Sequence, residues 1–202
     1  MTSPETHGAA SDVKTMLTWR SADADQMEQV RINLVGARMR AHGRIISAAV
    51  DDREAFSVSY ELVTNDAGET RRLSVRLVKT SGESQLDISR DMDGRWMVQT
   101  ADSIVHSDFG GADTVDLWHS PFLKTLVVRR HGLLGAKSAI EVPVVELSLP
   151  NCSVDLVEKS YTFSGLGSDD GAVTLSSARG EWDLTVDRYG LVTDFPKIAS
   201  RI

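Results

Sequence analysis

Apolar and polar residues alternate one by one along most of the chain, which is the pattern of half-buried β-strands. Val30, Ile32 and Leu34 alternate with polar neighbours, and similar runs recur around 56–62, 73–77, 86–88, 95–98, 139–149, 152–163, 173–175, 182–186 and 191–195. Turn-forming residues such as Asn65–Gly68 and Asp91–Gly94 separate these runs. No long segment has the period of an amphipathic helix, so the sequence predicts an all-β, antiparallel fold.

Three of the expected strands carry local irregularities. The small residues and Gly43 in the segment 38–50 predict a bend or bulge where the strand changes face. The runs 139–149 and 152–163 each shift their apolar phase partway, the first near Pro143. Because neighbouring strands shift together, we expect a coiled hairpin that leaves one core layer and joins another.

A possible internal repeat divides the chain into two similar β-meander halves. Tyr60 and Tyr161 each open a strand, and each is followed by a glycine-containing turn, two further strands and an Asp-x-x-Gly turn, which starts at Asp91 in one half and at Asp187 in the other. Meanders also reuse turn chemistry without duplication, so two readings stay open: a true repeat, or a recurring turn.

Composition narrows the class of protein. The chain has 202 residues, 41% of them hydrophobic and 25% charged, which is typical of a globular protein. We expect a disordered tail at residues 1–12 and a single domain at 13–202. A net charge of −7 argues against nucleic-acid partners, and the apolar runs are too short for an integral membrane segment. The single cysteine, Cys152, and the lack of a secretory signal favour a cytoplasmic location.

The stretch from Asp116 to His131 departs from the alternating pattern and collects acidic, aromatic, histidine and arginine residues. Pro121 predicts a loop or short turn of helix there, followed by an apolar run and a basic end. Arginine can hold a phosphate or carboxylate with two hydrogen bonds. On a strand, Arg129 and Arg130 would face opposite ways, so we also expect one of them to pair with a buried acid such as Asp116 or Glu146.

Catalytic and metal motifs are weak. Asp116, His119 and Ser120 lie close in sequence, but no nucleophile-elbow motif supports a triad. The histidines lack the spacing of a zinc helix, and the Asp91 turn lacks the later ligands of a calcium loop, so we predict neither a metal nor a cofactor. Among the tryptophans, Trp118 is a candidate ligand contact because it sits beside His119 in a loop.

The order of these landmarks resembles the putative glycolipid-binding family, a former bacterial domain of unknown function. The resemblance rests on Asp116 to Phe122, Thr125-Leu126, Arg129-Arg130 and the terminal run 186–196. Leu123-Lys124 stands where the family segment has Thr-Asn. The resemblance implies an antiparallel spiral β-roll, an incomplete barrel with an apolar hollow, similar in shape to bacterial lipoprotein-carrier proteins.

The leading hypothesis is non-enzymatic binding of a lipid or glycolipid in that hollow, gated by residues 116–131. The candidate ligand-binding residues are Asp116, Trp118, His119, Arg129, Arg130, Tyr60 and Tyr161. A second hypothesis is a hydrolase or isomerase of a small hydrophobic substrate, with His119 as general base and Asp116 orienting it. A third is a protein-interaction scaffold, which a filled interior would favour.

Overall fold

The computed structural model describes residues 12–133, 138–166 and 170–202 of the chain. The first strand begins at Val13, and the tail expected at 1–12 lies, apart from Asp12, outside the described residues. Fifteen strands in the described parts join into one sheet, accompanied by one α-helix and one short 3-10 helix. The predicted all-β class is therefore confirmed.

The strands of the first half are β1 (Val13–Ser21), β2 (Gln26–Val35), β3 (Arg38–Ser47), β4 (Phe56–Thr64), β5 (Thr70–Lys79), β6 (Gly82–Arg90), β7 (Trp96–Gln99) and β8 (Ile104–Ser107). The 3-10 helix η1 (Phe109–Gly111), β9 (Thr114–Leu117) and helix α1 (Pro121–Arg130) follow. The second half contains β10 (Ser138–Ser148), β11 (Ser153–Leu166), β12 (Asp170–Ser177), β13 (Gly180–Asp187), β14 (Val192–Phe195) and β15 (Ala199–Arg201).

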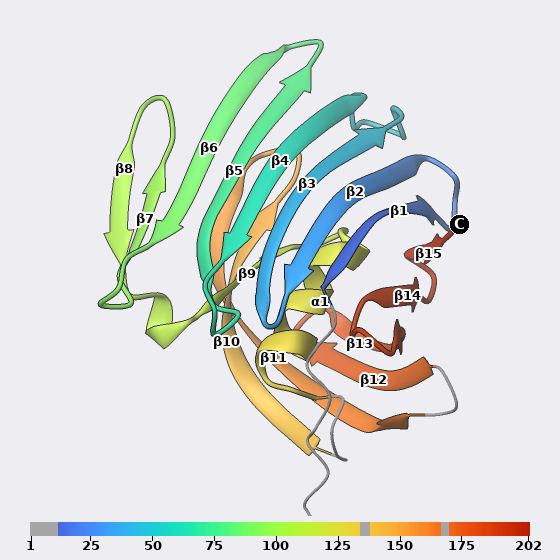
Figure 1. Cartoon of the computed structure of the whole chain (residues 1–202). Coiled ribbons are helices and arrows are strands. Elements are labelled where there is room, and N and C mark those ends of the chain that lie inside the picture. Colours follow the sequence, from blue (N-terminus) through green and yellow to red (C-terminus); the bar gives the residue numbers. More distant parts are fainter. Residues whose placement is uncertain (1–11, 134–137, 167–169) are drawn as a thin grey trace, which may run out of the picture.

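The sheet curls without closing. Its order is β8-β7-β6-β5-β4-β3-β2-β1-β15-β14-β13-β12-β11-β10-β9, so β1 and β15 join the two halves of the chain. Neighbouring strands run antiparallel, except that β9 lies parallel to β10. Figure 1 shows the strongly curved wall formed by β1–β6 facing the strands β10–β13. The predicted antiparallel roll, an incomplete barrel, is confirmed.

The two meanders of the suspected repeat have the same turn geometry. β4–β6 and β11–β13 are both three-stranded meanders. One carboxylate oxygen of Asp91 accepts from the backbone N–H groups of Asp93 and Arg95. Asp187 accepts in the same way from the residues two and four positions later. The meanders and their matching turns are present, and duplication as their origin stays a prediction.

Two hydrophobic cores meet at the hairpin of β10 and β11. Val144 packs in the core beneath β12–β14, whereas Val145 and Leu147 belong to the larger core beneath β1–β7. On β11, Tyr161 joins the smaller core and Val154 packs against the larger one. The predicted change of core layer is thus confirmed, and it lets one long hairpin close both cores.

The bend or bulge predicted at Gly43 was wrong. β3 keeps an unbroken register with both β2 and β4, and its residues alternate between exposed and buried along the whole strand. Gly43 faces inward, where the ring of its cross-strand partner Tyr60 occupies the space of a missing side chain. The glycine is explained by this close approach rather than by a change of face.

The inside of the curved sheet is filled by helix α1. Ser120 caps the helix by accepting from the Leu123 N–H, and Pro121 fits the first turn, where no N–H is needed. Residues 121–128 are all buried, with Phe122 in the larger core and Val128 in the smaller. In Figure 1 the helix lies between the two walls of the sheet. The open apolar hollow that we expected is occupied by this helix.

Candidate binding site at the Trp118–His119 pocket

Trp118 and His119 lie in the turn between β9 and α1. β9 runs along β10, and the Trp118 N–H donates to the Leu147 carbonyl at 3.3 Å. The Ser120 N–H donates to the Leu117 carbonyl at 2.9 Å, which closes a tight turn directly before the helix cap. The two side chains are therefore held by a short, anchored connection.

A pocket of about 260 Å³ opens beside this turn. Its walls combine apolar and polar side chains from β2, β3, β4, β9, β10 and four connecting loops, namely Gln26, Ile45, Arg53, Phe56, Leu117, Trp118, His119, Ser148, Leu149 and Arg179. Ligand sites commonly combine apolar walls with a few converging polar groups. This volume is slightly below the usual range for small-molecule sites, so it suits one head group rather than a whole lipid.

Two guanidinium groups border the pocket, and each has a carboxylate partner. Arg53 lies 2.8 Å from Asp25, and Arg179 lies 3.0 Å from Glu146. The Arg53 guanidinium also lies 5.8 Å from the centre of the Phe56 ring. Because these partners fix the guanidinium groups, their remaining N–H groups are oriented donors for hydroxyl or anionic oxygens.

A buried ionic cluster lies behind Trp118. Lys124 Nζ donates to both Asp116 oxygens at 2.8 and 2.7 Å, and also to the carbonyls of Leu117 and Trp118. Lys159 bridges Asp116 and Glu146. All four charged side chains are at most 2% exposed. Two lysines thus balance two carboxylates within the core.

Burial and charge act in opposite directions on this cluster. Burial alone would raise the pKa of Asp116, but the neighbouring lysines outweigh it and hold the pKa below its ordinary value. For Lys124, burial dominates and lowers the pKa to about 8 despite the Asp116 charge. For Lys159, the two carboxylates dominate and raise the pKa. Trp118 covers the cluster, with Lys124 and Lys159 at 5.3 and 5.8 Å from its ring.

The structure separates His119 from Asp116. The carboxylate of Asp116 is occupied by lysines, and in the described residues no hydrogen bond joins it to His119. His119 is exposed on one side and lines the pocket on the other. Desolvation, followed by the positive charge of Lys124, lowers the pKa of His119 and favours its neutral form. This arrangement does not provide the carboxylate–histidine pair that the hydrolase or isomerase hypothesis requires.

Arg129 and Arg130 lie on the last helical turn of α1, so the argument from opposite faces of a strand does not apply to them. Arg129 donates to the carbonyls of Tyr189 and Gly36. Arg130 pairs with Asp113 at 2.9 Å and with Glu69 at 3.3 Å. The partners are therefore neither Asp116 nor Glu146, and both arginines tie the helix end to surrounding loops.

Tyr60 and Tyr161 are buried in the cores and do not line the Trp118–His119 pocket. Tyr60 donates to Glu28 at 2.7 Å, and the same carboxylate oxygen accepts from the Ser120 hydroxyl at 2.7 Å. The Tyr161 hydroxyl has no hydrogen-bond partner among the described residues. Of the seven candidate residues, Trp118 and His119 line the pocket, and Asp116 lies in the cluster behind it.

Sequence reasoning missed four polar residues of the pocket, namely Gln26, Arg53, Ser148 and Arg179. They come from positions scattered over more than half of the chain and share no spacing motif. Only the strand register and the fold bring them to one place.

No helix in the described residues is long and apolar enough to span a bilayer.

Two crystal structures share this fold. A DUF1089 family protein from Pseudomonas aeruginosa has a TM-score of 0.69 and 21% sequence identity, covering 87% of this chain and 92% of that chain. A β-barrel-like protein of the domain of unknown function DUF1849 from Brucella abortus has a TM-score of 0.50 and 10% identity, covering 93% of each chain. At these identities the likeness concerns the fold.

The sequence comparisons give the family. No curated protein matches the chain. The profile of the family described as "Putative glycolipid-binding" matches residues 16–201. This range includes the whole Asp116–His131 stretch and every strand, apart from the first three residues of β1. The chain therefore belongs to the "Putative glycolipid-binding" family.

Proposed function

We propose that this protein binds a lipid or glycolipid without converting it, and that the polar head group occupies the Trp118–His119 pocket. The observation that carries the proposal is the combination of family membership with a pocket in which an indole, an imidazole and two guanidinium groups converge. Such groups contact sugar rings through apolar faces and hydroxyls through N–H donors.

The filled interior restricts where the ligand lies. Because α1 is buried along residues 121–128, the space inside the sheet is closed to an acyl chain in this conformation. The proposal therefore places the head group against Trp118 and His119. The acyl part begins at the apolar wall formed by Phe56, Leu117 and Leu149, where each methylene removed from water contributes roughly 0.8 kcal/mol.

Calorimetric titration with octyl β-glucoside, kept below its micelle concentration, tests the proposal. We expect His119→Ala and Gln26→Ala to weaken binding about tenfold, because each removes a polar contact without removing an ion pair. His106→Ala is the matched control, since His106 is exposed on β8 away from the pocket. The proposal fails if the native protein neither binds this probe nor carries lipid in native mass spectrometry.

A protein-interaction scaffold is the second candidate, favoured by the helix that fills the sheet. The same experiments separate the two. A scaffold has no need of the Trp118–His119 pocket. It therefore predicts that the protein carries no lipid and that His119→Ala does not change its binding to a partner protein.

A further inference from the structure

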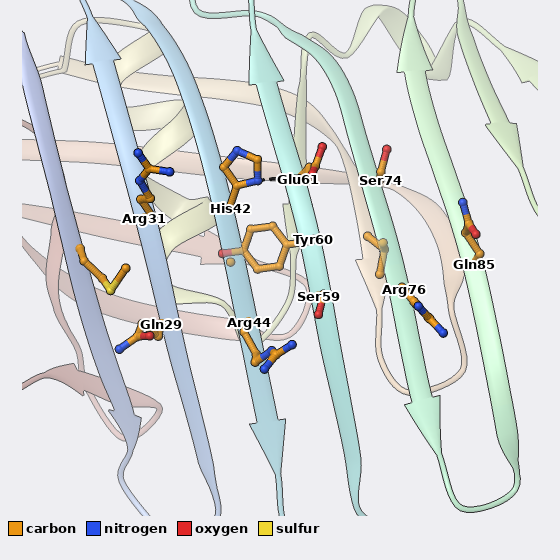
Figure 2. Close-up of a pocket in the computed structure, with 13 residues that line it drawn as sticks. Gln29, Arg31, His42, Arg44, Ser59, Tyr60, Glu61, Ser74, Arg76 and Gln85 are labelled. Atoms are coloured by element: carbon orange, nitrogen blue, oxygen red, sulfur yellow. Dashed lines mark ion pairs between the residues drawn. The ribbon is translucent and has the colours of Figure 1, made fainter.

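A second hollow lies on the outer face of the sheet, away from helix α1. It has a volume of about 570 Å³ and runs across β1–β6 around Gly43. Figure 2 shows polar side chains from neighbouring strands projecting into it, and these residues belong to β2 to β6. It shares no lining residue with the Trp118–His119 pocket, and it is more than twice as large. We call it the outer groove.

The strand register builds the outer groove from two rows of side chains. One row is Met16, Arg31, His42, Glu61 and Ser74, which are cross-strand neighbours on β1 to β5. The next row is Gln29, Arg44, Ser59, Arg76 and Gln85 on β2 to β6. Adjacent strands lie about 4.8 Å apart, so long side chains from alternate strands can reach one ligand.

This face is basic although the chain as a whole is acidic. Including the rows on either side of the groove, β1–β6 present seven lysine and arginine residues outward, namely Lys14, Arg20, Arg31, Arg40, Arg44, Arg72 and Arg76. Three carboxylates share the face, namely Glu61, Glu83 and Asp87. The net charge of −7 therefore does not describe this surface, and an anionic partner is compatible with it.

Two of the three carboxylates on this face pair with arginines, and neither pair involves Arg31 or Arg44, the two other arginines that line the groove. Glu83 pairs with Arg76 at 2.6 Å, Asp87 pairs with Arg72, and Glu61 lies 3.4 Å from His42. In residues 12–133, 138–166 and 170–202, Arg31 and Arg44 have no ion-pair or side-chain hydrogen-bond partner. Two unpaired guanidinium groups, flanked by amides and hydroxyls, match the oxygens of an anionic phosphate group.

We infer that the outer groove binds the phosphate group of a phosphate ester, with Arg31 and Arg44 as its principal ligands. Gln29, Ser59 and Gln85 supply neutral hydrogen bonds around it. The ester comes from one of two sources, a soluble sugar phosphate or a phospholipid head group in a bilayer. Met16 lines the groove and Ile46 follows Arg44 on the same face, and both are more than half exposed, so apolar contact is available beside the phosphate.

The test uses the full chain and three probes: inorganic phosphate, glucose 6-phosphate, and phosphatidylcholine vesicles with or without phosphatidylglycerol. Soluble probes are titrated by calorimetry and vesicles by sedimentation. We expect Arg31→Gln and Arg44→Gln to weaken binding about tenfold each, because each removes a charge-assisted contact. Both residues are exposed and unpaired, so the variants keep the fold, which circular dichroism verifies.

Arg40→Gln is the matched control, because Arg40 is an exposed arginine of the same strand that does not line the groove. Binding of a sugar phosphate alone identifies a soluble ligand, and binding of phosphatidylglycerol vesicles alone identifies a lipid head group. The inference is overturned if no phosphate probe binds at millimolar concentration, or if Arg40→Gln weakens binding as much as Arg44→Gln. Neither result bears on octyl glucoside binding at the Trp118–His119 pocket.

Discussion

The ammonium group of Lys124 donates to both carboxylate oxygens of Asp116, at 2.8 and 2.7 Å, and neither side chain reaches solvent. The pair joins helix α1 to β9 across eight positions of the chain. Two ions removed from water stabilise a fold only while they satisfy one another. Each side chain therefore offsets the desolvation cost of the other inside the core.

Asp116→Leu is expected to destabilise the fold by about 3–5 kcal/mol, because it leaves a buried ammonium group without its carboxylate. Lys124 would keep only the carbonyls of Leu117 and Trp118. Lys124→Met is expected to cost less, since Asp116 would still accept from Lys159 and from the Leu117 N–H. Urea denaturation measures both free energies of unfolding.

The exposed ion pair of Arg38 and Asp66 provides the control for that comparison. Its Nε–Oδ1 distance is 2.8 Å, but the side chains are 48% and 82% exposed. Arg38→Met should therefore cost about 0–1 kcal/mol. Equal losses for Asp116→Leu and Arg38→Met would show that the buried cluster contributes nothing specific.

The two buried tyrosines give a second prediction. Tyr60→Phe should cost about 1–3 kcal/mol, because the Glu28 carboxylate loses one of its donors in a buried site. Tyr161→Phe removes a hydroxyl that has no partner among the described residues, so it should be neutral or slightly stabilising. Thermal unfolding of the two variants tests this contrast, and a larger loss for Tyr161→Phe would contradict it.

Alternation predicted the strands because it is a local signal. Val30, Ile32 and Leu34 face the core in the structure as their spacing requires. The helix was harder to predict because it is surrounded by core. Its residues 121–128 are buried on every side, so they lack an amphipathic period, and Val127-Val128 also favour strands. The segment's unusual composition was visible in the sequence, but its role as the filling of the sheet was not.

The site was predictable only where its residues are close in sequence. Trp118 and His119 stood out as neighbours, and both line the pocket. Arg53 and Arg179 come from distant loops that only the folded sheet brings together. Lys124, a departure from the family segment, proved to be the partner of Asp116. The basic outer groove was hidden in the same way, because net charge averages over faces that the fold keeps apart.

The lowered pKa of His119 predicts a pH dependence of stability. Desolvation makes the folded-state pKa of His119 lower than its unfolded value near 6.5, so the unfolded chain binds more protons as the pH falls below that value. The free energy of unfolding should therefore decrease as the pH is lowered from 7 towards 5. Urea titrations of His119→Gln should show a weaker decrease than the native protein.

Two other groups also have shifted pKa values in the fold, so the comparison is made between variants. His131 also has a pKa lowered by burial, whereas burial raises the pKa of Glu28. His131→Gln should remove its own share of the slope. If His119→Gln has the same pH slope as the native protein, the desolvation of His119 has no energetic consequence.

Gly43 tests the close packing of the inner face. A Cβ at this position would lie 2.0 Å from Cζ of Tyr60, and the ring is held by Glu28 and stacked on Phe122 at 6.4 Å between centroids. Gly43→Ala should destabilise the fold by about 1–3 kcal/mol, because the ring cannot move aside without giving up these contacts. Equilibrium unfolding in urea gives the loss.

A double-mutant cycle shows whether the ring of Tyr60 is the cause. Tyr60→Leu removes the atoms that the new methyl group would meet, so adding Gly43→Ala to this variant should cost little, or even stabilise the strand by restricting the unfolded backbone. The two substitutions would then be strongly non-additive. Equal costs of Gly43→Ala in both backgrounds would assign the need for glycine to the β3 backbone rather than to the ring.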